Sequence, residues 1–165
     1  MPVLIDSAPA AGQDIALQTR KRWNIPNGQV TEISILELNN AKLLLRRYST
    51  SILDYRTDPT PIYNCHGLTF ASRRTGIYEV SAIHKILDDD EYKRVEIEAV
   101  LPGDAILYFD EDGDIEHSGI VVSRPQATLK VPQVVSKWGK FQEVIHWASQ
   151  CPYNYSTAKY YRIKN

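Results

Sequence analysis

The sequence predicts an α+β protein in which N-terminal helices pack on an antiparallel sheet. Two observations carry this prediction: apolar residues recur at helical spacing up to about residue 88, and they alternate with polar residues from about residue 94 onward. Helices followed by a run of strands with polar turns between them are typical of this class. The 165 residues correspond to about one domain.

The chain begins with a segment that differs from the rest. Residues 1–30 are rich in Ala, Gln, Pro and Gly and show weak periodicity, so we interpret them as an accessory arm that precedes a domain at 31–165. Within the arm, one helix is expected over 14–23. Over 30–56 the spacing of leucine and isoleucine predicts a helix in two pieces, because Asn39-Asn40 suggests a break.

Two more helices and four strands complete the expected order. Pro59 and Pro61 predict an extended approach to a short helix over 65–74, because each proline disfavours helix at the residue before it. A second helix is predicted over 79–88 from its apolar face. Alternation and short apolar runs then predict strands over 95–99, 105–109, 118–123 and 131–138.

Composition narrows the classes of partner. The net charge of -1 provides no global attraction to nucleic acid or to an anionic membrane, and neither is expected as a partner. No apolar stretch approaches the roughly 18 to 20 residues that span a bilayer. The segment Met1–Asp6 lacks the features of a signal peptide, so we predict synthesis in the cytoplasm and hypothesise delivery by a secretion system if the protein acts elsewhere.

Cys65 is the first candidate for chemistry. Asn64 before it can cap a helix, and a thiol at a helix N-terminus near an imidazolium has a lowered pKa. Backbone N–H groups at the same helix start could hold an oxyanion. Two alternatives stay open at this point: a buried structural cysteine and a disulfide with Cys151, the second of the two cysteines.

His117 is the second candidate. It precedes the apolar run Gly119–Val122, so it is expected at the start of a strand, from which it could serve Cys65 as general base and then acid. The alternative is a strand-end histidine facing water. We rank His66, His84 and His146 below it. The acidic run at 110–114 fails the calcium-loop pattern and predicts a hairpin turn, and no metal or cofactor is expected.

Three segments together resemble a known superfamily. Asn64-Cys65-His66-Gly67-Leu68-Thr69 resembles the Asp-Cys-Ser-Gly-Leu/Phe segment of NlpC/P60 cysteine peptidases. The segment at 102–109 resembles their Pro-Gly-Asp-Leu strand, which the related CHAP amidases share, and His117-Ser118-Gly119-Ile120-Val121 resembles their His-Val-Gly-Ile strand. The order is that of the family, and the resemblance covers about residues 55–140.

The resemblance implies a circularly permuted papain-like fold with Cys65 as nucleophile and His117 as base. In the family, a polar residue on the next strand orients the histidine. Ser136 is the first candidate for this role and Lys137 the second, because strand alternation places Ser136 with Trp138 on one face and Lys137 on the other.

The family also places a tyrosine upstream of the cysteine, near the oxyanion site. Tyr55 and Tyr63 both qualify, with Tyr55 favoured by its distance along the chain. Candidates for contacts to the substrate or oxyanion are therefore Tyr55, Tyr63, Asn64, Lys137 and Trp138.

These residues predict a cysteine-dependent amide-bond hydrolase, a peptidase or amidase. The resemblance implies a cell-wall peptide or similar isopeptide as substrate, and a linked hypothesis makes the chain an interbacterial effector with an immunity or carrier protein as partner. Asn64 and His66 depart from the family pattern and place the chain outside the standard peptidoglycan endopeptidases. Two alternatives remain: a protein deamidase or acyltransferase toxin on the same fold, and a catalytically degenerate binding module. The oligomeric state is not predicted.

Overall fold

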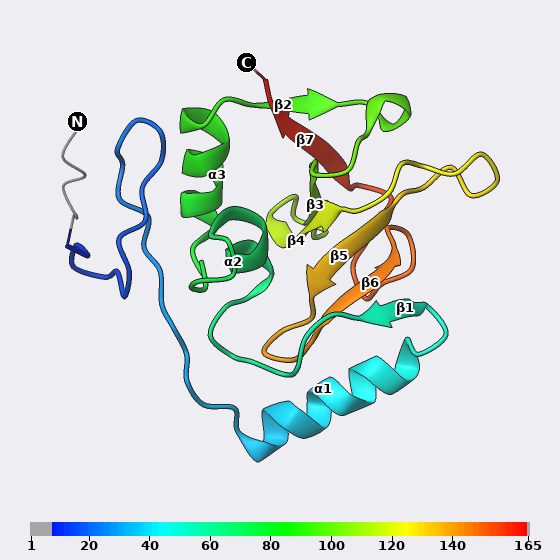
Figure 1. Cartoon of the computed structure of the whole chain (residues 1–165), viewed down its shortest axis with the longest axis horizontal. Helices are drawn as coiled ribbons and strands as arrows, with labels where there is room; N and C mark the ends of the chain where they lie inside the picture. The colour runs from blue at the N-terminus through cyan, green and yellow to red at the C-terminus, as the bar shows by residue number, and fades with distance from the viewer. Residues whose placement is uncertain (1–7, 165) are drawn as a thin grey trace.

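The computed structural model describes residues 8–164, and its centre is one antiparallel sheet of seven strands in the order β1-β6-β5-β4-β3-β7-β2 (Figure 1). The predicted α+β class is therefore confirmed. The strands are β1 (Ile52–Tyr55), β2 (Tyr92–Val95), β3 (Ala105–Phe109), β4 (Ile115–Val121), β5 (Gln133–Lys137), β6 (Glu143–Trp147) and β7 (Lys159–Ile163). The helices are α1 (Ile35–Arg47), α2 (Cys65–Phe70), α3 (Val80–Asp89) and the 3-10 turn η1 (Ile97–Ala99).

Each face of the sheet is covered by different elements, and we name the faces by their helices. The α2 face carries Leu107, Ser118, Val135, Lys137 and Glu143, and it packs against α2, α3 and the N-terminal segment. The α1 face carries Tyr108, His117, Ser136, Val144 and His146, and it packs against α1 and the segment after β6. Alternation along β5 thus separates Ser136 from Lys137, as predicted.

The N-terminal segment forms no helix between residues 8 and 30, so the helix predicted over 14–23 is wrong. The side chains of Gln13 and Asn27 instead hydrogen-bond to backbone groups of the segment, which competes with helical pairing. Leu17 and Ile25 are buried in a cluster with α3, alongside which the segment runs (Figure 1). The rest of the predicted arm, residues 1–7, including Met1–Asp6, lies outside the described residues.

Helix α1 runs unbroken through Asn39-Asn40, so the predicted break is wrong. Both asparagines are exposed, where each costs a few tenths of a kcal/mol relative to a good helix former. A capping box between Ser34 and Glu37 begins the helix, and the burial of Leu45 fixes its inner side. Cap and packing together outweigh the weak propensity.

Other boundaries shift without changing the order of elements. The helix expected over 65–74 ends at Phe70, because the backbone enters the left-handed region at Ser72 and Arg73. The helix predicted over 79–88 is confirmed as α3. The strand expected over 95–99 is wrong beyond its first residue: β2 ends at Val95, and η1 follows, where Ala99 O accepts a hydrogen bond from Arg162.

The segment before β3 is a structural turn. Gly103 has φ +96, which favours glycine, and its N–H donates to Val121 O at 2.8 Å. The Asp104 carboxylate is buried and accepts the N–H of Leu101 (2.8 Å) and two bonds from Arg162 of β7 (2.6 and 2.7 Å). Pro-Gly-Asp thus fixes the start of β3 against its neighbours. In the part of the chain described, no helix is long and apolar enough to cross a membrane.

Candidate active site

Asn64 and Gly67 position the start of α2. The Asn64 side-chain oxygen accepts the N–H of Gly67 (2.9 Å) and of Ile77 (3.1 Å), and its amide donates to Ile77 O (2.7 Å). A side chain at Gly67 would collide with the carbonyl oxygen of Thr75, so glycine permits the close approach of helix and loop. Asn64 therefore holds Cys65 in place, and its polar atoms are engaged in doing so.

Cys65 is the first residue of α2 and is a free thiol, as is Cys151. The alternative of a disulfide between Cys65 and Cys151 is therefore wrong. Burial raises the pKa of the Cys65 thiol to about 11, against the opposing effects of the backbone N–H groups of Ser118, His66 and Cys65 itself and of the charge of Lys137. This direction is opposite to the lowered pKa expected from the sequence, because burial outweighs the donors around the sulfur.

His117 lies on the α1 face as the third residue of β4, not at the start of the strand as predicted, and it does not face water. Its ring is 1% exposed and stacks on Tyr153 at 3.8 Å between ring centroids, with an angle of 8° between the planes. Burial, followed by the charges of His66 and His146, holds the pKa of His117 well below its usual range, so the imidazole is neutral. Its Nε2 is a buried polar atom with no hydrogen-bond partner in the described residues.

Cys65 and His117 both lie near the point where the pairing of β4 and β5 ends, Cys65 on the α2 side of the sheet and His117 on the α1 side. The pairing of these strands ends at Gly119 and Ser136, and the next N–H along β4, that of Ser118, is directed at the Cys65 sulfur. The Cys65 charge also acts on Tyr153, which stacks on His117. No hydrogen bond joins Cys65 to His117 within residues 8–164.

Ser136 is engaged by other partners on the α1 face. The Nδ1 of His146 lies 2.8 Å from Trp147 O and must donate to it, which leaves the Nε2 of His146 as an acceptor. Ser136 Oγ, 2.8 Å away, therefore donates to that Nε2 and accepts from the indole N–H of Trp138 at 3.0 Å. The hydroxyl proton of Ser136 is thus used by His146, not by His117.

A second chain of hydrogen bonds fixes His66 on the α2 face. The Thr69 hydroxyl donates to Cys65 O (2.9 Å), so it accepts from Ser118 Oγ at 3.0 Å. Ser118 then accepts from the Nδ1 of His66 at 2.8 Å. Burial lowers the pKa of His66 to about 4, and the ring is a neutral support that joins α2 to β4.

Lys137 belongs to a charged cluster on the α2 face. Its ammonium donates to Gly139 O (2.9 Å) and Phe141 O (2.7 Å) and lies 5.1 Å from the centre of the Tyr63 ring. Opposite it across the strands, Glu143 accepts from the Tyr63 hydroxyl (2.6 Å) and from Arg73 (2.5 and 3.2 Å). The cluster ties β5 and β6 to the segment that leads into Cys65.

The remaining predicted residues divide between these groups. Tyr63 is buried and committed to Glu143, whereas Tyr55 is 48% exposed at the end of the edge strand β1. Trp138 is buried between Ser136 and Tyr48, whose ring it meets edge to face. The structure therefore gathers Tyr63, Asn64 and Lys137 on the side of Cys65, and Ser136 and Trp138 on the side of His117.

The sequence singles out the C-terminal tyrosines either as the lining of a groove or as packing under the last strand. Tyr153 lies in the irregular segment after β6, where it stacks on His117 and lines a cavity, whereas Tyr155 packs against Tyr160 of β7, with their hydroxyls 3.0 Å apart. Sequence reasoning missed the stacking of Tyr153 on His117 and the charged partners Glu143 and Arg73. The buried Glu143 within an apolar strand is the one signal that could have been read, because a buried carboxylate needs a cation.

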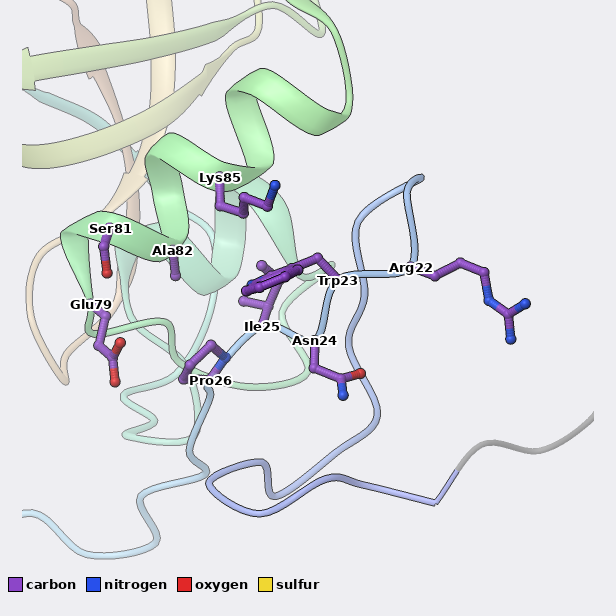
Figure 2. Close-up of a pocket in the computed structure, with 9 residues that line it drawn as sticks. All are labelled: Arg22, Trp23, Asn24, Ile25, Pro26, Glu79, Ser81, Ala82 and Lys85. Carbon is purple, nitrogen blue, oxygen red and sulfur yellow. The ribbon is translucent and has the colours of Figure 1, made fainter.

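Two cavities lie near these elements. A cavity of about 480 Å³ separates α1 from the loop after β5, and Trp138, Phe141 and Tyr153 line it, so it reaches the aromatic ring that stacks on His117. A larger one of about 630 Å³ lies between the N-terminal segment and α3, where Lys85 extends over the Trp23 ring (Figure 2). The larger cavity contains none of the predicted site residues.

The chain was compared with protein-family models, curated protein sequences and solved structures, and none of the three comparisons gave a match.

Proposed function

We propose that this protein is a cysteine-dependent amide-bond hydrolase with a papain-like arrangement, in which Cys65 is the nucleophile and His117 the base. The observation that carries the proposal is made where the pairing of β4 and β5 ends. There the backbone N–H of Ser118 is directed at the Cys65 sulfur, and the preceding residue of β4, His117, has a buried nitrogen with no partner in the described residues. An unpartnered buried polar group is costly, and such groups are retained at functional sites.

The electrostatics favour a neutral pair over a thiolate–imidazolium pair. The pKa of Cys65 is raised and that of His117 is lowered, both mainly by burial, so thiol and imidazole are both uncharged near neutral pH. His117 therefore acts as a general base that takes the thiol proton as the sulfur attacks, in the manner of a serine–histidine pair.

The reaction proceeds in two balanced halves. In the first, the sulfur bonds to the amide carbonyl carbon as His117 takes its proton, and the carbonyl oxygen becomes an anion held by backbone N–H groups. The C–N bond then breaks, the amine takes the proton from His117, and a thioester on Cys65 remains. In the second, water gives a proton to His117 and attacks the thioester, the C–S bond breaks, and the sulfur takes the proton back.

The smaller cavity is the proposed site for the substrate chain. Its aromatic lining suits the apolar parts of a peptide, and its wall contains Tyr153, the residue that joins it to His117. By the resemblance of the three segments, the substrate is a cell-wall peptide or an isopeptide. The same thiol and base would also serve a deamidase or an acyltransferase, which differ from the hydrolase in the acceptor or the amide attacked.

The test is incubation with purified peptidoglycan and mass spectrometry of the released fragments. We expect the wild type to release fragments with new carboxyl and amine ends, and Cys65→Ala to release none. Cys151→Ala, which removes the other thiol, is the matched control and keeps the activity. Identical products from the wild type and Cys65→Ala would overturn the proposal.

A further inference from the structure

We propose that the buried ammonium of Lys137, rather than the hydroxyl of Ser136, is the third functional group of the site, and that it stabilises negative charge on the Cys65 sulfur. This inference rests on the proposed function, in which Cys65 is the nucleophile. It is carried by the burial of Lys137, by its unusual set of partners, and by its position relative to the segment that leads into Cys65.

Lys137 is a lysine that water does not reach. Its relative exposure is 0%, although lysines are almost never fully buried unless they are paired. Its ammonium is held by two backbone carbonyls, Gly139 O and Phe141 O, which belong to the turn between β5 and β6. An ammonium has three N–H donors, so this tether uses two of them and leaves one.

The charge of Lys137 is not matched by a carboxylate ion pair in the described residues. Glu143 lies opposite on β6, but its two oxygens accept hydrogen bonds from Tyr63 and Arg73. The cluster thus contains two cations, Lys137 and Arg73, and one anion, Glu143. The cluster therefore has one more positive than negative charge. Because it is largely buried, this charge can stabilise an anion that forms nearby during a reaction.

Besides Glu143, whose oxygens are engaged by Tyr63 and Arg73, the group whose negative charge acts on Lys137 is the sulfur of Cys65. The Lys137 ammonium lies over the ring of Tyr63, two residues before Cys65, on the same face of the sheet as α2. The field of Lys137 lowers the pKa of Cys65, and the charge of Cys65 raises that of Lys137. Burial nonetheless lowers the pKa of Lys137 to about 8, so at neutral pH the ammonium is largely present.

Other groups around the pair are neutral in the same range of pH. The Cys65 sulfur is also faced by Tyr78, Tyr153 and His66, and burial raises the pKa of both tyrosines and lowers that of His66. Lys137 is faced by Glu143, the one carboxylate of the cluster. Lys137 is therefore the cation whose removal should change the charge at the sulfur.

The test is the pH profile of Cys65 alkylation by iodoacetamide, followed by mass spectrometry that separates Cys65 from Cys151. For the wild type we expect the logarithm of the rate to rise steadily with pH below pH 8 and less steeply just above it, because Lys137 loses its charge there while the pKa of Cys65 is higher, about 11. At pH 7, Lys137→Met should lower the rate about tenfold, because the loss of the nearby positive charge raises the pKa of Cys65 further. Lys137→Arg keeps the charge and should restore most of the rate.

Lys159→Met is the matched control, because Lys159 also lies over an aromatic ring, 4.8 Å from that of Phe109, but on β7. It should leave the profile unchanged. A profile of Lys137→Met that coincides with the wild type would overturn the proposal, and so would a wild-type rate that rises with the same slope below and above pH 8. The wild-type profile keeps the test decisive if Lys137→Met does not fold.

The result is separable from the proposed function. A shifted profile together with intact peptidoglycan would leave Lys137 coupled to Cys65 and reject the hydrolase. Cleavage by the wild type together with unshifted profiles would keep the hydrolase and reject the role of Lys137.

Discussion

The two faces of the central sheet differ in the kind of polar side chain that they carry. On the α2 face, the buried Lys137 and Glu143 belong to a cluster of charged side chains that also includes the exposed Arg73. On the α1 face, His117 and His146 are buried among aromatic rings, and burial lowers the pKa of each, so both are neutral. Cys65 begins α2 on the charged side, next to the end of the β4–β5 pairing.

We infer from this difference that the two faces serve different steps of the proposed reaction. A histidine that is already neutral can accept a proton directly, and burial among aromatic rings keeps His117 neutral. Charge that develops on sulfur or oxygen is better stabilised on the face where cations are already fixed, because fixed charges need no reorganisation during the reaction. The β4–β5 strand pair thus carries a proton acceptor, His117, on one face of the sheet and a cation, Lys137, on the other.

The largest expected effect comes from the neutral face. His117→Phe keeps a ring on Tyr153 and removes the unpartnered nitrogen, so the free energy of unfolding should stay within about 1 kcal/mol or rise. Activity should fall by about 10²- to 10⁴-fold, because the general base is lost. Urea unfolding and peptide release measure the two quantities separately. A stable variant with full activity would remove His117 from the mechanism.

The next largest effect tests the charged face. Glu143→Ala leaves the Tyr63 hydroxyl and Arg73 without their acceptor and should lower the free energy of unfolding by about 3 kcal/mol, a value reduced from the usual range because Arg73 is 43% exposed. Urea unfolding measures the loss. Glu116→Ala, an exposed residue of β4, is the control and should change the free energy by less than about 0.5 kcal/mol.

The neutral histidines also predict a pH dependence of stability. His66 and His146 have folded pKa values of about 4, below the roughly 6.5 of the unfolded chain, so their contribution is complete above pH 6.5 and is lost as pH falls toward 4. Each should cost about 2 kcal/mol between pH 7 and pH 5.

His117 shares this direction of shift. The slope of unfolding free energy against pH should therefore be shallower in His117→Phe than in the wild type by about one proton. His84→Gln, on an exposed position of α3, should keep the wild-type slope. Equal slopes in the wild type and His117→Phe would show that His117 is not buried in its neutral form.

The smallest effect separates Ser136 from Lys137. Ser136→Ala leaves the Nε2 of His146 and the indole N–H of Trp138 without their partner, so we expect a loss of about 2 kcal/mol in unfolding free energy. Because the hydroxyl proton serves His146, the alkylation rate of Cys65 should change by less than about twofold. A tenfold loss of Cys65 reactivity would instead make Ser136 the orienting residue.

Local patterns in the sequence predicted the central strands and the start of α2. Buried apolar runs mark β3, β4 and β5, and alternation along β5 assigns Ser136 and Lys137 to opposite faces. Strands β1, β6 and β7 were not predicted. In β7, Lys159 and Arg162 interrupt the apolar pattern, and Arg162 forms an ion pair with Asp104.

The rest depends on contacts between residues far apart in the chain. Tyr63 and Glu143 are hydrogen-bonded across 80 positions, and no spacing rule links them. Likewise, the neutrality of His117 and the raised pKa of Cys65 arise from burial, which is set by the way the segment after β6 and helix α2 close over the strands. Sequence alone could name the two residues but not their electrostatic state.

The most direct test of the account is the alkylation rate of Cys65 near neutral pH in the wild type and in His117→Phe, with Cys151 as the internal reference. We expect Cys65 in the wild type to react at least tenfold faster than in His117→Phe, and faster than the buried Cys151 in either protein. Equal rates at Cys65 in the two proteins would contradict the claim that these residues act as nucleophile and base.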